Sequence, residues 1–383
     1  MSGISDKRDV RMNKYLNGTL AIDGSYMIHR CLKTPDLWEL RNKRGERTGG
    51  IYGFFRCFQF AMKECDYFPV ICWDCGQSPR RLELYPNYKH HMDKALVRRA
   101  EQYALMLLNR EIENLPGDVT LEERKAVEEA MQKFMEVKQK HGSYEDPDDY
   151  VSQYKRQRDL VISICHSLGV PSILVSHWEG DDLITLLTRI SKKAIIVTDD
   201  RDMIQLLSPD VSIYRAMAKE HLEYDSYLKA NSANSSREFV IAKAISGDPS
   251  DNISSVTDME AERKYRVGEK TTLRIAKVIS DNREDRQAYT KALLEITDKD
   301  RNKIQGFIRN LPIYERNMKL VDLSLVENDL QVINGIIAEV KANSGNPKFF
   351  DVLSKLGELD ITTVDVNSLI ASLTARYRQS FEK

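Results

Sequence analysis

The sequence predicts an α/β protein whose central sheet is largely parallel. Five short apolar runs have the length and composition of buried strands, at residues 19–23, 68–74, 172–176, 194–199 and 211–215. Strands that alternate with helical patterns, as these do, are typical of parallel sheets. Nearly every strand ends in a carboxylate or runs directly into one. Because the active crevice of an open α/β sheet lies at the carboxyl ends of its strands, these acids are expected to converge there.

The helical patterns that alternate with these strands lie at residues 51–64, 154–169 and 181–191. An insertion between about 80 and 150 interrupts the alternation. It contains a basic helical stretch, a Pro-Gly-Asp break and a second helix. We therefore expect a helical excursion from the sheet at this point of the chain.

The strand signal fades after residue 216. Residues 237–246 are predicted to be helical and lead into the segment SGDPSDNISSV. Residues 267–280 then predict a glycine-containing turn that opens another helix, and from about 284 onward the chain is mostly helical.

Bulk composition limits the class of protein. The 383 residues are enough for about two domains at roughly 150 residues each. With 57 Lys and Arg against 58 Asp and Glu, the net charge of -1 predicts no polyanion partner, so any basic surface must be local. Residues 1–18 contain no apolar signal region, and no apolar run approaches the ~20 residues of a membrane span. We expect a cytosolic-type protein without a membrane segment.

Carboxylates gather at the strand ends and loop–helix junctions. Taken in chain order they are Asp23, Asp74, Glu179, Asp181, Asp182, Asp200, Asp202, Asp248 and Asp251. Any one of them alone is more simply a turn residue or a helix N-cap, and Asp181 and Asp182 could merely complement a helix dipole. That simpler interpretation weakens when five separate loops of one sheet share the feature. So many acids in one crevice would repel one another unless cations were present.

Hard divalent cations supply the missing attraction. Mg²⁺ and Mn²⁺ prefer oxygen ligands, and no histidine accompanies the cluster at ligand spacing, which argues against zinc. His177 lies on the strand side and is more simply structural. Two such ions about 3.5–4 Å apart would clamp an in-line phosphoryl displacement. The acids therefore predict metal-dependent phosphodiester hydrolysis.

The six cysteines are scattered, but the spacing CWDC at 72–75 is compatible with a zinc or redox site. No second pair of ligands follows at finger spacing, and Cys72 lies within a predicted strand. Reduced thiols in the core are the simpler interpretation.

Seven sequence blocks resemble a known family, motif by motif and in order. They read LAIDG, GGIYGFF, VICWDCG, LYPNYK, WEGDDLI, VTDDRDMIQLL and AISGDPSDN, and with the residues that follow they cover positions 19 to about 280. The chain resembles the 5′-nuclease, or flap endonuclease, superfamily, and within it the phage 5′-3′ exonucleases of the T-even ribonuclease H type.

The resemblance implies a PIN-like nuclease domain, a helical arch and a helix-three-turn-helix element on the DNA. The implied divisions of the chain are a flexible arm at 1–18, the nuclease domain at 19–236 with the arch inserted at 80–150, the DNA-binding element at 237–283 and a helical C-terminal region at 284–383.

The resemblance also assigns the acids to two metal sites, and it implies two Mg²⁺ or Mn²⁺ ions. The first site would use Asp23, Asp74, Glu179 and Asp181 with Asp182 beside them, and the second would use Asp200, Asp202, Asp248 and Asp251. Asp199 occupies a place usually held by a small or neutral residue. It would either reach the metals through water or cap the following helix. A monovalent cation at the helix-three-turn-helix is a further expectation.

Residues 80–99 form a basic stretch with interleaved tyrosines. It carries Arg80, Arg81, Lys89, Lys94, Arg98 and Arg99, together with Tyr85 and Tyr88. Such a run is ordinarily a solvated helix face, but cations beside aromatic rings also suit single-strand phosphates and base stacking. In the family the lysine of the YK motif contacts the scissile phosphate, which implies that role for Lys89, with Arg80, Arg81, Tyr85 and Tyr88 as nucleic-acid contacts.

The chain departs from the family just after this motif. Relatives often carry an arginine where this sequence has Met92. The second arch cation must then be another residue, with Arg98 and Arg99 the first choices and His91 a weaker one.

A second departure is an enlarged loop between Asp251 and Gly268. The segment VGEKTT keeps the core of the family's motif, which implies that Gly268, Lys270 and Thr271 meet a backbone phosphate at a helix N-terminus. An ordinary capped helix is the alternative. Near the first strand, Tyr26 and Arg30 could contact the template strand or the terminal base, although a core tyrosine with a surface arginine is equally compatible with the pattern.

The sequence thus predicts a divalent-metal-dependent 5′-3′ nuclease acting on duplex DNA, RNA–DNA hybrid or 5′ flaps. It would remove RNA primers and flaps in replication, as a monomer in the cytoplasm, or in the host cytoplasm if phage-encoded. Docking to a single-strand-binding protein or a sliding clamp is a family-based hypothesis, because the ending RQSFEK lacks the paired aromatics of a clamp-binding motif.

Three alternatives can be told apart by sequence features. A PIN-type ribonuclease would lack the GDPSDN and VGEKTT segments, and a structure-specific nucleic-acid-binding protein with weak catalysis would lack some of the acids. A haloacid-dehalogenase-type phosphatase needs a second aspartate two residues after the first, where this chain has Ser25.

Overall fold

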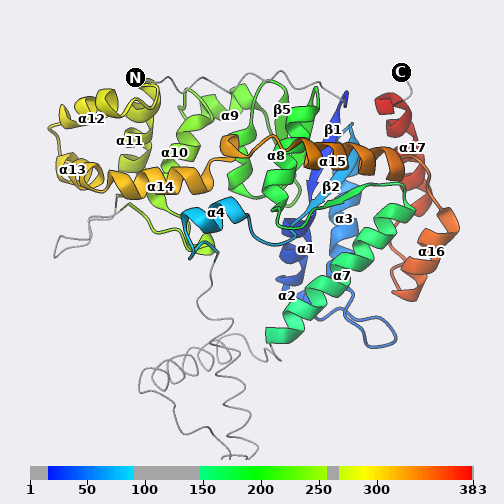
Figure 1. Ribbon diagram of the computed structural model, residues 1–383. Coiled ribbons are helices and arrows are strands. Elements are labelled where there is room, and N and C mark those ends of the chain that lie inside the picture. The colour runs from blue at the N-terminus through cyan, green and yellow to red at the C-terminus, as the bar shows by residue number, and fades with distance from the viewer. Residues whose placement is uncertain (1–15, 90–146, 257–266, 382–383) are drawn as a thin grey trace, which may run out of the picture.

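A six-stranded sheet organises the computed structural model, which describes residues 16–89, 147–256 and 267–381 (Figure 1). The strand order is β3-β2-β1-β4-β5-β6. The strands are β1 (Thr19–Asp23), β2 (Phe68–Trp73), β3 (Ser172–Leu174), β4 (Ala194–Val197), β5 (Val211–Arg215) and β6 (Glu220–Leu222). All neighbouring pairs are parallel except β5 and β6. The largely parallel sheet and the five predicted strands are confirmed.

The sixth strand escaped sequence analysis because it has no apolar run of its own. β6 is three residues long, and its Glu220 and His221 are exposed. It forms by antiparallel pairing with β5, in which His221 lies opposite Tyr214. Its existence depends on a neighbour rather than on local propensity.

Both faces of the sheet are covered, as the near-continuous apolar strands require. Leu20 and Ile22 of β1 point into one core, while Ala21 between them points into the other. The first core holds side chains of α1 (Gly24–Leu32), α3 (Gly49–Glu64) and α7 (Pro147–Ser167). The second holds those of α8 (Gly180–Ile190) and α15 (Leu330–Asn343). As predicted, Leu183, Leu186 and Leu187 anchor α8 in the core.

A third core joins five helices at one end of the molecule, shown on the left of Figure 1. These helices are α10 (Arg237–Ser246), α11 (Glu269–Asp281), α12 (Arg286–Leu294), α13 (Arg301–Arg309) and α14 (Leu311–Val321). Predicted helices at 51–64, 154–169, 181–191, 237–246 and 267–280 are confirmed, with ends that shift by at most two residues except for the start of α7, which lies seven residues earlier than predicted.

The C-terminal helices return to the sheet. Side chains of α16 (Phe349–Glu358) and α17 (Val366–Phe381) share the first core with Trp73 of β2. The chain after residue 284 is therefore divided between two cores: α12–α14 pack with α10 and α11, whereas α15–α17 cover the sheet. At the other end of the described chain, Leu16 is buried and bridges to Ser191, so ordered structure begins before the predicted arm ends at 18.

The remaining elements are short. They are α2 (Pro35–Trp38), α4 (Pro79–Leu84), α9 (Tyr224–Ala230) and the 3₁₀ turns η2 (Arg201–Leu206), η3 (Pro249–Asp251) and η4 (Leu323–Leu325). Most of the predicted arch, residues 90–146, lies outside the described residues. Among the helices that are described, none has the length and apolar character needed to cross a membrane.

Candidate metal and nucleic-acid site

Parallel strands bring acids from distant parts of the chain to one edge of the sheet. Asp23 ends β1, Asp74 follows β2 and Asp200 follows β4 by three residues. Because β1 lies between β2 and β4, the three carboxylates come from neighbouring strands. The N-terminus of α8 adds Glu179 and Asp181 from the same side, since the Gly180 amide donates to the Asp74 carboxylate at 2.6 Å.

Asp23 is held in place by protein donors yet remains electrostatically crowded. It caps α1 by accepting from the Tyr26 amide at 2.9 Å, and it accepts from the Thr198 hydroxyl at 3.1 Å. Only 4% of the residue is exposed. Burial, together with the carboxylates of Asp74 and Asp200, raises the pKa of Asp23 to about 7. Its local hydrogen bonds therefore do not compensate its charge.

Asp181 is also electrostatically crowded. Burial and the carboxylates of Asp23, Asp200 and Asp74 raise the pKa of Asp181 well above its ordinary value, although Lys89 opposes the shift. The side chains of Asp23, Asp74, Asp181 and Asp200, which we call the crevice acids, thus interact with one another from four segments of the chain. An all-oxygen donor set with uncompensated negative charge fits a hard divalent cation.

Glu179, in contrast, is fully paired. Its Oε1 accepts from the Ser78 amide at 3.0 Å, and its Oε2 accepts from the Tyr88 hydroxyl at 3.0 Å and the Lys89 ammonium at 2.6 Å. Burial alone would raise the pKa of Glu179, but Lys89 and Arg81 outweigh it and hold that pKa below its ordinary value. The predicted metal ligand therefore has protein cations as its neighbours in this structure.

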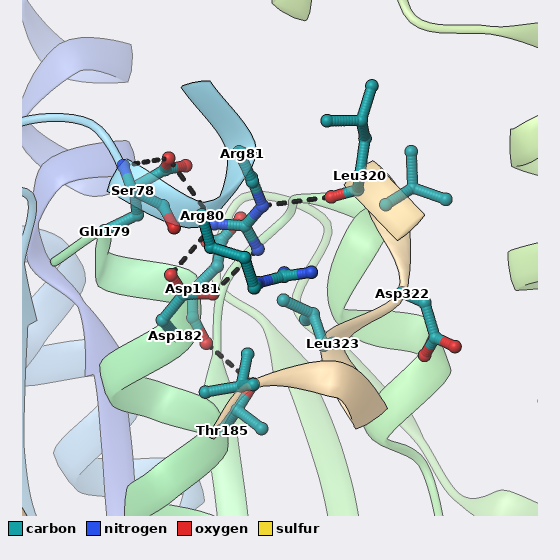
Figure 2. Close-up of polar contacts among 12 residues, drawn as sticks. Ser78, Arg80, Arg81, Glu179, Asp181, Asp182, Thr185, Leu320, Asp322 and Leu323 are labelled. Atoms are coloured by element: carbon teal, nitrogen blue, oxygen red, sulfur yellow. Dashed lines mark hydrogen bonds and ion pairs between the residues drawn. The ribbon is translucent and has the colours of Figure 1, made fainter. Parts of the chain in front are cut away.

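Arg81 and Asp182 form a buried pair (Figure 2). The two guanidinium Nη atoms donate to the two carboxylate oxygens at 2.8 and 2.7 Å, and Nε donates to the Leu320 carbonyl at 2.9 Å. Arg81 is 2% exposed and Asp182 is 4% exposed. Burial would lower the pKa of Arg81, but Asp182 and Glu179 raise it, so the guanidinium is firmly charged.

This pair corrects two sequence predictions. Asp182 does not bind beside the other acids, because both of its oxygens are taken by Arg81. Arg81 does not offer a contact for nucleic acid, because it is enclosed. Arg80, next to it, is half-buried and donates to the Lys319 carbonyl at 2.8 Å. These contacts fasten α4 to α8 and α14 instead.

The two tyrosines of the basic stretch also differ from expectation. Tyr88 is 3% exposed, and its hydroxyl donates to Glu179 and lies 3.3 Å from the Asp251 carboxylate. The Tyr85 ring is half-buried and has the Arg316 guanidinium over it at 4.4 Å. Base stacking needs an accessible ring face, so the prediction of a stacking role is wrong for Tyr88 in this structure, and Tyr85 offers a ring already contacted by a cation.

Lys89 lies beside the acids through its contact with Glu179. Its backbone adopts a φ of 48°, and its amide donates to the Asp251 carbonyl at 2.9 Å. Burial would lower the pKa of Lys89, but Glu179, Tyr88 and Asp251 raise it, so the ammonium is charged. Its catalytic role stays a prediction. Arg98 and Arg99, together with Lys94, His91 and Met92, lie outside the described residues.

A lysine that sequence analysis did not identify lies among the acids of the second predicted metal site. Lys243 of α10 forms ion pairs with Asp202 and with Asp248, the latter at 2.7 Å. Burial would raise the pKa of Asp248, but Lys243 outweighs it and lowers that pKa. Asp251, which lies near Lys89 instead, has a pKa raised to about 6, mainly by burial. The sequence did contain a signal for it, because Lys243 is a lone lysine in the mostly apolar run that precedes GDPSDN.

Local backbone geometry places these acids. Asp200 caps η2 by accepting from the Asp202 amide at 2.9 Å. Gly247 has a φ of 71°, and a Cβ there would lie 2.5 Å from the Ile253 carbonyl oxygen, so a glycine is required before Asp248. Asp200, not Asp199, caps the turn that follows, and Asp199 lines the same cavity as Asp200, Asp202 and Asp248. The Asp199 carboxylate accepts from the Met217 amide at 3.2 Å and lies 3.7 Å from Arg215, which corrects the predicted capping role of that residue.

The carboxylates are not yet gathered as a ligand set. Within residues 16–89, 147–256 and 267–381, no three acidic, histidine or cysteine side chains converge on one point as metal ligands. Lys89 and Lys243 explain part of this, because they occupy oxygens of Glu179, Asp202 and Asp248. Side-chain rotation would be needed before these acids could share an ion.

The segment predicted to contact the duplex backbone is partly exposed to solvent. Gly268 caps α11, and both it and Lys270 are exposed. Thr271 is 4% exposed, and its hydroxyl donates to Asp300 at 3.1 Å, so this hydroxyl does not face a ligand, contrary to prediction. Near β1, Tyr26 is half-buried and Arg30 is exposed, which fits both alternatives left open for them.

The two cysteines of the CWDC segment differ in burial, and Cys75 is only half-buried. Cys72 is fully buried in β2, where burial raises the pKa of its thiol far above the ordinary value. All six cysteines are free thiols. Cys31, Cys65, Cys72 and Cys165 are buried, as the core interpretation predicts, whereas Cys57 and Cys75 are half-buried.

Comparison with known proteins bears on this edge of the sheet. Residues 131–233 match the family described as the 5′-3′ exonuclease N-terminal, resolvase-like domain. This part of the chain is similar to that family of 5′-3′ exonuclease domains. The chain is also 25% identical over 267 residues to DNA polymerase I of Streptococcus pneumoniae, and 24% identical over 260 residues to the thermostable DNA polymerase I of Thermus thermophilus. Each match covers 67% of this chain but only 23% of the polymerase.

Among solved structures, the chain resembles the flap endonuclease of bacteriophage T5 in a complex with DNA and metal ions. The TM-score is 0.52 at 18% sequence identity, and the match covers 85% of this chain and all of that one, 100%. The structure of the same phage protein crystallised with metal ions gives a TM-score of 0.50. At this identity the likeness establishes the fold alone, and it confirms the predicted PIN-like α/β fold.

Proposed function

We propose that the chain is a divalent-metal-dependent 5′-3′ nuclease that hydrolyses phosphodiesters of duplex DNA, RNA–DNA hybrid or 5′ flaps. Its task would be the removal of RNA primers and flaps in replication, a setting that its DNA polymerase relatives support. The observation that carries the proposal is the mutual charge repulsion of the crevice acids at the carboxyl edge of a parallel sheet. The exonuclease family match names the reaction class.

The crevice acids Asp23, Asp74, Asp181 and Asp200 are the residues that would hold the metal. A bound hard divalent ion supplies Lewis acidity and neutralises charge on a phosphate, and two such ions, Mg²⁺ or Mn²⁺, are the number that we propose. Glu179 and the acids of the second group would join after Lys89 and Lys243 release them.

Lys89 is the group of this chain that we propose meets the scissile phosphate. Its backbone is fixed by the Asp251 carbonyl, while its side chain is 28% exposed and lies at the rim of the acid crevice. A charged ammonium that exchanges Glu179 for a phosphate oxygen would stabilise negative charge that develops during attack. Tyr88 would keep Glu179 and Asp251 aligned during that exchange, because its hydroxyl contacts both.

The exposed N-terminus of α11 is the proposed contact for the duplex backbone. Gly268 lets a phosphate approach the first amides closely, and Lys270 adds positive charge. A monovalent cation at this element, a single-strand-binding protein or sliding clamp as partner, and a monomeric state stay predictions.

The test is a cleavage assay on 5′-labelled flap, nicked and RNA-primed duplexes, with Mg²⁺ and with chelator. Asp181→Asn is expected to lower the rate at least a hundredfold, about the effect of losing one charge-stabilising group in an active site. Asp210→Asn is the matched control, because Asp210 is exposed and precedes β5, at the opposite edge of the sheet. Absence of metal-dependent product from every substrate would overturn the proposal in favour of a structure-specific binding protein.

A further inference from the structure

Lys243 joins two carboxylates that come from different parts of the fold. Asp202 lies on η2, just after the sheet, and Asp248 lies in the turn after α10. The ammonium pairs with both, and its side chain is 20% exposed. Two anions and one cation leave this group with a net charge of about -1. The lysine therefore compensates these acids incompletely.

A cavity adjoins this ion-paired group. It has a volume of about 630 Å³, and its lining includes Asp202, Lys243 and Asp248 together with Phe239 and Tyr227. A lysine side chain has a flexible four-carbon stem that can cover apolar surface while its ammonium stays in water. The cavity thus offers Lys243 a second place to lie, next to the one it occupies.

Lys89 provides the contrast within the same crevice. Its backbone is fastened to Asp251 on one side, and its side chain meets Glu179 at 2.6 Å. Lys243 is held at the backbone by α10, and its ammonium contacts both Asp202 and Asp248. Displacing Lys243 would therefore free two carboxylates at once, whereas displacing Lys89 would free mainly Glu179.

We propose that Lys243 is a built-in counter-cation that competes with a divalent ion for Asp202 and Asp248 and thereby sets the metal affinity of that pair. The inference rests on the proposed metal dependence and deepens it. A divalent ion between the two carboxylates would bring their net charge to zero and release the ammonium into the adjoining cavity. The lysine is a positioning residue here, since it acts through the two acids.

Metal titration without nucleic acid tests the competition. Mn²⁺ is titrated calorimetrically into the wild-type chain, Lys243→Met, Lys243→Gln and the control Lys341→Met, which alters an exposed lysine on α15. Loss of two charge-assisted contacts to the acids is expected to tighten the weaker Mn²⁺ site roughly tenfold in both Lys243 variants and to leave the control unchanged.

The outcomes separate the two claims. Wild-type binding of Mn²⁺ with no tightening in either Lys243 variant overturns this inference and leaves the proposed function standing. Failure of every form to bind Mn²⁺ overturns both.

A labelling experiment on the wild-type chain avoids any folding defect of the variants. Reductive methylation of lysines is followed by mass spectrometry with and without Mg²⁺. If a metal ion displaces the ammonium, Lys243 is expected to become several-fold more reactive in Mg²⁺, because an ion-paired amine is protected. Lys341 should react equally in both conditions. Unchanged or lower reactivity of Lys243 in Mg²⁺ would show that the lysine stays on its acids and would overturn the proposal.

Discussion

Asp181 and Asp182 are consecutive residues on the first turn of α8, and they lie in opposite electrostatic environments. Asp181 points toward Asp23, Asp74 and Asp200 and shares their uncompensated charge. Asp182 points toward Arg81, which meets both of its oxygens. One step along a helix turns a side chain by about 100°, so neighbours in sequence reach different surroundings.

The difference teaches how this protein separates stability from function. Around Arg81 the charges are matched inside the fold, and the contacts to α4, α8 and α14 make the pair structural. Around Asp181 the charges are left unmatched, so the folded chain keeps a repulsion that a bound cation would relieve. Each prediction below alters one side of this contrast.

The largest effect is expected from Arg81→Met. It leaves Asp182 and part of Glu179 as buried, unpaired charges, which should destabilise the fold by about 3–5 kcal/mol. Urea denaturation measures the free energy of unfolding. Arg301→Met, an exposed arginine on α13, is the control and should change it by less than about 0.5 kcal/mol.

The double variant Arg81→Met with Asp182→Leu sharpens this prediction. Removing both charges should recover most of the lost stability, because an apolar pair can replace a buried ion pair. Equal stability of the single and double variants would contradict the view that Asp182 is the partner of Arg81.

Adding Mg²⁺ should stabilise the fold through the crevice acids around Asp181. An ion that binds only the folded chain stabilises it by about 2.7 kcal/mol at a concentration a hundred times the dissociation constant. We expect the melting temperature to rise with Mg²⁺ in the wild type and to rise less in Asp23→Asn. An equal rise in both would mean that the ion binds away from Asp23.

The pH dependence of stability should reveal the same repulsion. The folded pKa of Asp23 is about 7, above its ordinary value of 3.8, so its neutral form is favoured in the fold. Protonation of Asp23 in the fold therefore stabilises the folded state. This stabilisation is complete below the unfolded pKa and is lost as pH rises through 7, by up to ~1.4 kcal/mol per pH unit and proton. In chelator, the melting temperature should therefore rise when the pH is lowered from 8 to 6.

Asp23→Asn is the matched variant for that experiment, since asparagine can still accept the capping hydrogen bond. It should be more stable than the wild type at pH 8 in chelator, and its pH dependence should be flatter. The depressed pKa values of Glu179 and Asp248 act in acid, below this window. Identical pH profiles for the two proteins would refute the assignment to Asp23.

The smallest effect is expected from Tyr88→Phe. The hydroxyl that links Glu179 and Asp251 is lost while the ring is kept, which should cost about 1 kcal/mol of stability. Differential scanning calorimetry measures it. A loss above that of Arg81→Met would reverse the ranking of the two contacts.

The sequence predicted most of the fold correctly, for a reason visible in individual elements. Thr19–Asp23 and Phe68–Trp73 are buried along their whole length because both of their faces are covered, so their mainly apolar patterns were readable locally. β6 was missed because its residues become a strand only beside β5. The return of α16 and α17 to the first core left no signal in the sequence beyond ordinary helical periodicity.

The sequence by itself determined that acids would gather at one edge of a parallel sheet. That follows from strand direction, since parallel strands carry their final residues to the same side. Only the tertiary structure decided which acids are compensated. Arg81 reaches Asp182 across 101 positions of chain, and Lys243 reaches Asp202 from another helix. Such pairings depend on how helices pack, and packing is set by long-range contacts that no local pattern of residues records.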